Sequence, residues 1–373
     1  MPALVGGFGN ISSNLSLESN RLSWFKYYYS FNLVDKNTKS FCLTQNTSDY
    51  LGDFSGTCNH GSFIINSNLG SYLAGLIEGD GTIAIHMQDQ NKSSTAKKYR
   101  PKIIIVFKLA DLPLANYLQE LTNCGTIYSK SDRGYILWQI QDIVGVYTIV
   151  KIINGFMRTP KIEALNRCID WLNYYIYYNK ESKLASTKLI LSKIQHIESK
   201  SLDNSPIESN SWLAGFTDAD GHFSINIHKR SNKNSIRVQL FYRLEIRQTY
   251  HRLDNNDDKY SFFPIFSKLA NYLGTNVLSR SRSIGDKDFF SFIVISSSKN
   301  SLLKTSDYFN KFPLLSSKFL DYQSWLHILE LQNSHKMTSL YLDEALKIRK
   351  NFNKTRTVFC WEHLKNCYLT KIK

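Results

Sequence analysis

The chain has 373 residues, and its 46 Lys and Arg against 31 Asp and Glu give a net charge of +15. A hydrophobic content of 42% excludes a wholly disordered chain, and the lack of a long apolar run argues against a transmembrane helix. Six scattered cysteines without a CxxC pair support neither a disulfide scaffold nor a structural zinc site. Composition therefore predicts a protein of about two domains whose partner is a polyanion.

Residues 1–66 are rich in Ser, Asn and Gly and lack a sustained apolar period. We expect an irregular extension here. The segment is neither an Arg-rich amphipathic presequence nor a secretory signal, so the sequence predicts no import or export signal.

A repeat divides the rest of the chain. Residues 73–81 read LAGLIEGDG, and residues 213–221 read LAGFTDADG. A repeat of this length predicts two copies of one domain. We expect the copies at 67–180 and 209–333, joined by an exposed polar linker at 181–208 and followed by a basic amphipathic helix and tail at 334–373.

Each copy shows the same order of hydrophobic patterns after its motif. The first predicts strands at 82–88 and 103–109, a helix at 112–121, strands at 125–129 and 135–141, and helices at 144–157 and 161–178. The second predicts strands at 222–228 and 238–247, a helix at 264–273, strands at 275–280 and 289–296, and helices at 301–310 and 317–331.

Each motif reads as a helix that ends at its glycines. In the first copy Asn68 is a suitable cap, and Gly79 with Gly81 suits a helix stop. Small residues four apart form a narrow ridge on each motif helix, which allows the two helices to pack closely. They are Gly75 and Gly79 in the first and Gly215 and Ala219 in the second.

This packing would bring Asp80 and Asp220 together at the foot of the pair. Converging carboxylates in a basic protein suit a divalent cation that activates water against a phosphodiester. A lone Asp before Gly is usually a turn residue. Its recurrence in one nine-residue frame favours a function.

The two motifs resemble those of a LAGLIDADG homing endonuclease of the single-chain, double-motif type, and the resemblance covers residues 67–331. It implies an α+β fold of two pseudo-symmetric αββαββα halves. The motif helices would form the interface, and the antiparallel sheets would form a saddle over the major groove of DNA. The chain would act as a monomer.

The resemblance also implies the site residues. Asp80 and Asp220 would be the catalytic acids that bind Mg²⁺, for which Mn²⁺ or Ca²⁺ would substitute, and Gly79 and Ala219 would offer backbone carbonyls to the metal. Lys161 and Lys318 would act electrostatically or organise water, the alternative being solvated lysines at helix starts. Gln248 matches a polar strand-end position, which Leu109 fills in the first half. Glu78 stands where the family has Asp.

A further set of residues suits DNA recognition. In residues 237–247 the apolar side chains alternate with Arg and Gln, the residue types that pair with guanine and adenine edges. Other basic residues fall in apparent hairpins, where phosphate contact or plain solubility is expected. The predicted DNA-binding residues are Lys98, Arg100, Arg133, Arg230, Lys233, Arg237, Gln239, Arg243, Arg247, Arg280 and Arg282.

Two functions remain open at this point. Residues 1–10 are similar to a stretch of cytochrome oxidase subunit 1, as expected for an intron reading frame that continues from an exon. With the Asn, Lys, Ile and Tyr bias, this predicts a mitochondrial group I intron product. It would be an endonuclease that cuts double-stranded DNA at the exon junction or an RNA maturase that binds the intron. Retention of both Asp80 and Asp220 favours cleavage.

Overall fold

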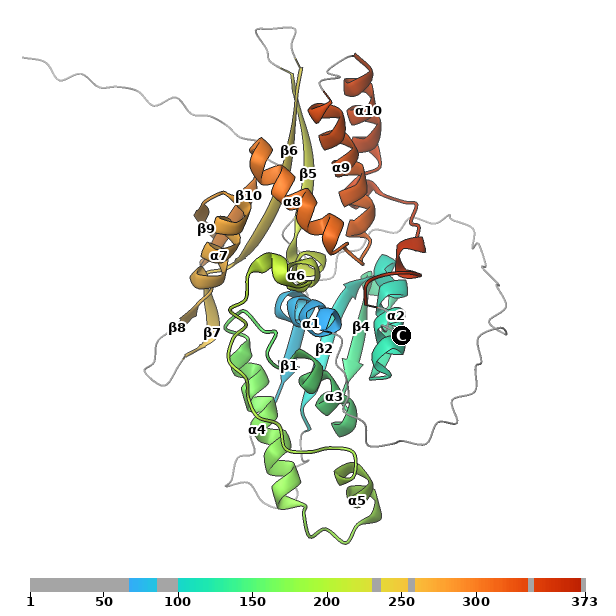
Figure 1. Ribbon diagram of the computed structural model, residues 1–373, viewed down its shortest axis with the longest axis vertical. Coiled ribbons are helices and arrows are strands. Elements are labelled where there is room, and N and C mark those ends of the chain that lie inside the picture. Colours follow the sequence, from blue (N-terminus) through green and yellow to red (C-terminus); the bar gives the residue numbers. More distant parts are fainter. Residues whose placement is uncertain (1–66, 86–99, 230–235, 254–258, 335–338, 370–373) are drawn as a thin grey trace, which may run out of the picture. The chain divides into compact units, whose positions relative to one another are not determined.

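Both repeats fold into the same α+β arrangement in the computed structural model (Figure 1), which describes residues 67–85, 100–229, 236–253, 259–334 and 339–369. The first half contains α1 (Ser67–Asp80), β1 (Gly81–Ala84), β2 (Lys102–Lys108), α2 (Leu112–Thr122), β3 (Thr126–Lys130), β4 (Tyr135–Ile140), α3 (Ile143–Ile153) and α4 (Ile162–Tyr178). Its sheet is antiparallel in the order β1-β2-β4-β3.

The second half repeats this order. It contains α6 (Trp212–Asp220), β5 (His222–Lys229), β6 (Ile236–Arg247), α7 (Phe263–Leu273), β9 (Val277–Ile284), β10 (Lys287–Ser296), α8 (Lys299–Lys311) and α9 (Lys318–Asn333). Its antiparallel sheet has the order β5-β6-β10-β9, the same topology as the first. The predicted αββαββα order is confirmed in both halves.

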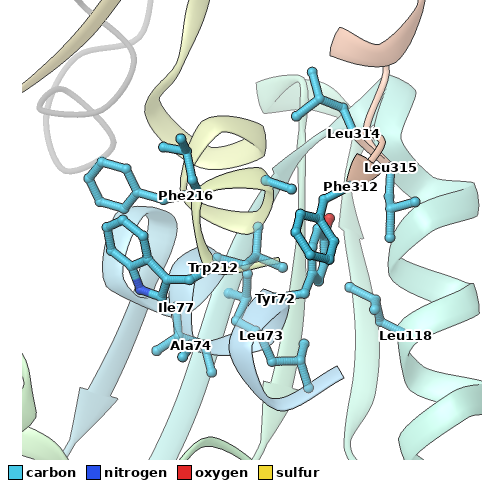
Figure 2. Packing of buried hydrophobic residues seen from close by; sticks show 14 of the residues in the cluster. Tyr72, Leu73, Ala74, Ile77, Leu118, Trp212, Phe216, Phe312, Leu314 and Leu315 are labelled. Atoms are coloured by element: carbon cyan, nitrogen blue, oxygen red, sulfur yellow. The ribbon is translucent and has the colours of Figure 1, made fainter. Parts of the chain in front are cut away.

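The strand alternation explains why each sheet has one buried face. Ile103, Ile105 and Phe107 of β2 are buried, as are Val238, Leu240, Tyr242 and Leu244 of β6. Helices cover these faces, with α2 against β4, α8 against β6 and β10, and α9 against β5. The two motif helices contribute to the same continuous core, to which α1 gives Tyr72 and Ile77 and α6 gives Trp212 and Phe216 (Figure 2).

Three details differ from the sequence-based expectations. Asn68 lies inside α1 and is not its cap. The segment 181–208 contains a short helix, α5 (Ala185–Leu191), and buries Ile194 and Ile207, so it is not simply exposed. A hairpin of β7 (Thr249–Leu253) and β8 (Lys259–Ser261) follows β6 and was not predicted.

The C-terminal segment packs on the fold instead of extending from it. After α10 (Ser339–Lys350), which contacts α9, the chain buries Leu364, Cys367 and Leu369. The Cys367 thiol donates to the hydroxyl of Tyr117 on α2 at 3.1 Å. The C-terminal segment is thereby tied to the first repeat. Among the described helices, none is long and apolar enough to cross a membrane.

Candidate active site

The motif helices α1 and α6 cross with their backbones in contact, and this crossing positions the site. A Cβ added at Gly75 would overlap the carbonyl oxygen of Trp212 and lie 2.7 Å from the nitrogen of Phe216. The second helix repeats the arrangement, because a Cβ at Gly215 would overlap the Tyr72 carbonyl. Only glycine permits this approach, so the small residues serve the helix crossing as predicted.

The crossing brings the carboxyl ends of the two helices together. Gly79 lies inside α1 and does not cap it; a Cβ there would overlap the Cβ of Ala219 and lie 3.2 Å from Oδ2 of Asp220. Asp80 and Asp220 are the last residues of their helices and are partly buried. Gly79 therefore provides room for Ala219 and the Asp220 carboxylate.

Glu78, at the sixth motif position, anchors the segment before α4. The Glu78 carboxylate accepts the backbone N–H groups of Arg158 at 3.0 Å and Thr159 at 2.6 Å, and the Thr159 hydroxyl at 2.6 Å. It also accepts the indole N–H of Trp212, on the other motif helix, at 2.5 Å. Burial raises its pKa, and these four donors oppose the rise.

Asp218, at the sixth motif position of the second half, anchors the segment before α9 in the same way. Its carboxylate accepts the backbone N–H of Leu315 at 2.8 Å, the hydroxyl of Ser316 at 2.5 Å and, from the first motif helix, the hydroxyl of Tyr72 at 2.8 Å. Each sixth-position acid therefore ties its own half to the opposite helix. The sequence drew attention to Glu78 only as a departure from the motif, and this paired role was missed.

These anchored segments deliver Lys161 and Lys318 to the ends of the motif helices. The ammonium of Lys161 donates to the carbonyl oxygens of Ile77 at 2.9 Å, Glu78 at 2.7 Å and Gly81 at 2.9 Å. That of Lys318 donates to Thr217 at 2.9 Å and Ala219 at 2.8 Å. A cation suits the carboxyl end of a helix, where carbonyls lack partners and the dipole is negative. The alternative of solvated helix-start lysines is wrong.

Both lysines are perturbed in the same way. Burial lowers the pKa of Lys161 to about 8, with Asp220, Glu78 and Asp80 acting in the opposite direction. Burial and the charge of Lys108 lower the pKa of Lys318 to about 8, against Asp80, Asp218 and Asp220. The charges of Asp80 and Asp220 thus act on the pKa of both lysines, and the four groups form one electrostatic cluster at the ends of the motif helices.

The strand ends beside this cluster carry further basic residues. Burial lowers the pKa of Arg247, at the end of β6, while Tyr250 and Asp220 act against it. Lys108 occupies the equivalent end of β2, one residue before the position given to Leu109, and was missed. Gln248 donates to the Ser279 hydroxyl at 2.6 Å and so lies against β9.

The described residues include no group of three or more His, Cys, Asp or Glu side chains arranged to hold a metal ion. A cation at the motif aspartates would therefore complete its coordination with carbonyl oxygens, water or phosphate.

The chain matches the model of the LAGLIDADG endonuclease family over residues 73–175 and 213–329, which is more than half of its length. This protein belongs to that family.

Relatives and solved structures agree with this membership. The chain is 42% identical to intron-encoded DNA endonuclease aI3 of Saccharomyces cerevisiae, over 99% of this chain and 82% of the relative. It is 28% identical to an uncharacterized cox1 intron-2 protein of Schizosaccharomyces pombe, over 77% of this chain and 74% of the relative. The fold is similar to LAGLIDADG homing endonuclease I-GzeII in complex with its DNA target, with a TM-score of 0.55 at 18% identity, over 77% of this chain and 99% of that one.

In this LAGLIDADG protein the residues predicted to bind DNA are spread over several elements. Arg237, Gln239, Arg243 and Arg247 share the face of β6 that is turned away from the core, as the alternation predicts. Arg280 and Arg282 lie on β9, and both approach Glu245 of β6. Arg100 and Arg133 are exposed, Arg133 within 3.6 Å of Asp132. Lys98, Arg230 and Lys233 lie outside the described residues.

Proposed function

We propose that the chain is a site-specific endonuclease of intron homing that hydrolyses one phosphodiester bond in each strand of a DNA duplex. The observation that carries this proposal is the paired ending of the motif helices, with Asp80 and Asp220 in one cluster with Lys161 and Lys318. A structural helix pair has no need for two carboxylates and two partly desolvated ammonium groups at its end. Membership of the family supports the same chemistry.

The residues at this end of the helix pair fit a divalent cation, with Mg²⁺ as the physiological ion and Mn²⁺ or Ca²⁺ as substitutes. Asp80 and Asp220 would supply carboxylate oxygens, the ligands that Mg²⁺ prefers, and Gly79 and Ala219 would supply carbonyl oxygens. The carbonyl of Ala219 already accepts Lys318, and its second lone pair leaves it able to face a cation. When bound, the cation would polarise the phosphate, favour ionisation of a water and stabilise the leaving 3′ oxygen.

The protein's own groups would organise the substrate. Lys161 and Lys318 place positive charge where negative charge develops on the phosphorus-bound oxygens, and the motif helices hold that charge in a fixed place. Water would attack phosphorus, the bond to the 3′ oxygen would break, and that oxygen would leave with a proton. Gln248 would lie at the edge of this site, beside Arg247.

The substrate would be double-stranded DNA at the exon junction, held across both sheets by a monomer with one functional domain per repeat, at 67–180 and 209–333. The resemblance implies a short 3′ overhang. A mitochondrial origin is supported by the similarity of residues 1–10 to cytochrome oxidase subunit 1, a segment outside the described residues, and by the cox1 intron relative.

The test is cleavage of a duplex with the joined-exon sequence in the presence of Mg²⁺. We expect a double-strand cut that a chelator abolishes and that Asp220→Asn reduces by at least about 100-fold. Asp170→Asn, at an exposed position on α4, is the matched control and should cut normally. An undiminished cut by Asp220→Asn would overturn the assignment.

Maturase activity is a separate question with a separate assay. A splicing reaction of the host intron RNA would be run with the wild-type protein and with Asp220→Asn. If the wild-type protein cuts no DNA, and both it and Asp220→Asn support splicing, the maturase would be favoured over the endonuclease.

A further inference from the structure

The two sheets share one topology but differ in the chemistry of their open faces, by which we mean the strand faces turned away from the buried core. In each sheet the second strand, β2 or β6, lies between two neighbours. On β2 the open-face residues are Lys102, Ile104, Val106 and Lys108. On β6 they are Arg237, Gln239, Phe241, Arg243, Glu245 and Arg247.

The strand registers allow a position-by-position comparison. Thr82 pairs with Ile104, and His222 pairs with Arg243. Thr82 and His222 directly follow the last motif glycine of their halves. Ile104 therefore corresponds to Arg243, and two residues on, Val106 corresponds to Glu245. Apolar groups in the first half thus replace charged groups in the second.

The apolar character of the first open face extends across the sheet in the row of Val106, whereas Ile104 pairs with the polar Thr82 and Gln139. Val106 pairs with Leu137 of β4, which pairs with Tyr128 of β3. Ile104, Val106 and Leu137 are only partly buried and lie outside the hydrophobic core, and Tyr128 is 39% exposed. Lysines stand at the strand ends, at Lys102, Lys108 and Lys130. Such an apolar strip suits contact with the edges of bases, and the lysines at its rim suit contact with the flanking phosphates.

In the corresponding row of the second half, Glu245 pairs with Ile293, which pairs with Leu278, so the halves differ at the β6 position, where Glu245 forms a hydrogen-bonded cluster. The Glu245 carboxylate accepts Arg243 and Arg282, and the Ser291 hydroxyl at 2.7 Å, with Arg280 at 3.8 Å. Burial opposes ionisation, yet Ser291 and the arginines hold the pKa of Glu245 below its usual range. One carboxylate cannot neutralise three guanidinium groups, so the cluster keeps a net positive charge and holds its donors in place.

We infer that the two halves recognise their half-sites by different chemistry, the second by hydrogen bonds to guanine N7 and O6, and the first by contact with thymine methyl groups. This inference rests on the proposed function. Guanidinium groups pair with the major-groove edge of guanine, whereas apolar side chains discriminate thymine by its C5 methyl. Alternate residues of a strand are about 6.8 Å apart, the spacing of two base steps, so Ile104 and Val106 address nearby bases.

The experiment uses single-atom changes in the joined-exon duplex. Each thymine in turn is replaced by deoxyuridine, which lacks the methyl, and each guanine by 7-deazaguanine, which lacks N7. Competition against the unmodified duplex gives the ratio of kcat/KM values. We expect deoxyuridine to lower kcat/KM by about fourfold per contacted methyl in one half-site only. We expect 7-deazaguanine to lower it by about tenfold in the other half-site only.

Two variants assign the half-sites to the halves of the protein. Val106→Ser, which removes both methyl groups, should flatten the deoxyuridine effect, and Arg243→Ala the 7-deazaguanine effect, each without changing the other. Val358→Ser, at a position 70% exposed, and Arg349→Ala, on the exposed side of α10, are the matched controls. The comparison of modified and unmodified duplexes with the wild-type protein still tests the inference if a variant fails to fold.

Equal methyl and N7 effects in both half-sites, or a variant that acts on the wrong half-site, would overturn the inference and leave the proposed function intact. A joined-exon duplex that is not cut at all would overturn the proposed function instead.

Discussion

Replacing Gly75 by alanine tests whether backbone contact between the motif helices sets the active site. The new Cβ would overlap the Trp212 carbonyl oxygen, so the helices would have to separate by about 1 Å to reach ordinary contact. Overpacking costs about 3 kcal/mol at the upper end of its usual range, and the helix propensity of alanine returns about 1 kcal/mol. We expect a net loss near 2 kcal/mol, or about 4–8 °C in Tm.

Cleavage should suffer more than stability, because a misplacement of about 1 Å at a reacting centre costs about 100-fold in rate. Thermal unfolding and single-turnover cleavage of the joined-exon duplex measure the two effects. Gly145→Ala in α3 is the matched control, since the nearest neighbours of its Cβ would be side-chain atoms of the capping Asp142 and of Ile140, and not backbone. It should lose no more than about 1 kcal/mol and cut normally.

The double variant makes the prediction sharper. Separation of the helices by Gly75→Ala also makes room for a Cβ at Gly215. The double variant should therefore lose clearly less unfolding free energy than the sum of the losses in Gly75→Ala and Gly215→Ala. Strict additivity, or a Gly75→Ala protein with wild-type stability and cleavage, would refute the reasoning.

Three further predictions follow from the site and the surface. Asp218→Asn removes the charged acceptor of the Leu315 and Ser316 donors and should cost about 2–3 kcal/mol in urea unfolding, with a slower cut; a wild-type unfolding midpoint would contradict this. Burial lowers the folded-state pKa of Lys161 and Lys318 to about 8, so the unfolded chain binds more protons between pH 8 and 10.5. The unfolding free energy of the DNA-free protein should therefore gain a rising contribution over that window, which the Lys161→Met, Lys318→Met double variant should lack; an equal slope in both proteins would exclude it. DNA affinity, measured by titration, should fall by about 10³-fold or more between 50 and 200 mM salt if at least six phosphates are contacted, and a flat profile would show that the basic surface is not the footprint.

Much of the fold could be predicted from local sequence patterns. Period-two alternation located β2, β4, β6 and β10, and the repeat indicated that both halves share one topology. The β7–β8 hairpin and α5 were missed because both are short and have weak periodicity. The burial of the C-terminal segment could not be predicted either, since its partner, Tyr117, lies 250 residues away in the first half.

For the site, the repeated nine-residue frame was enough to predict two small-residue ridges and two acids at the ends of the motif helices. It did not determine what surrounds them. Only the tertiary structure showed that Glu78 and Asp218 anchor the opposite helix and the lysine segments, and that Lys161 and Lys318 close the helix ends. These bonds join residues 80 or more positions apart, where sequence spacing carries no information. A helix crossing and the burial of an ammonium group depend on the packed whole.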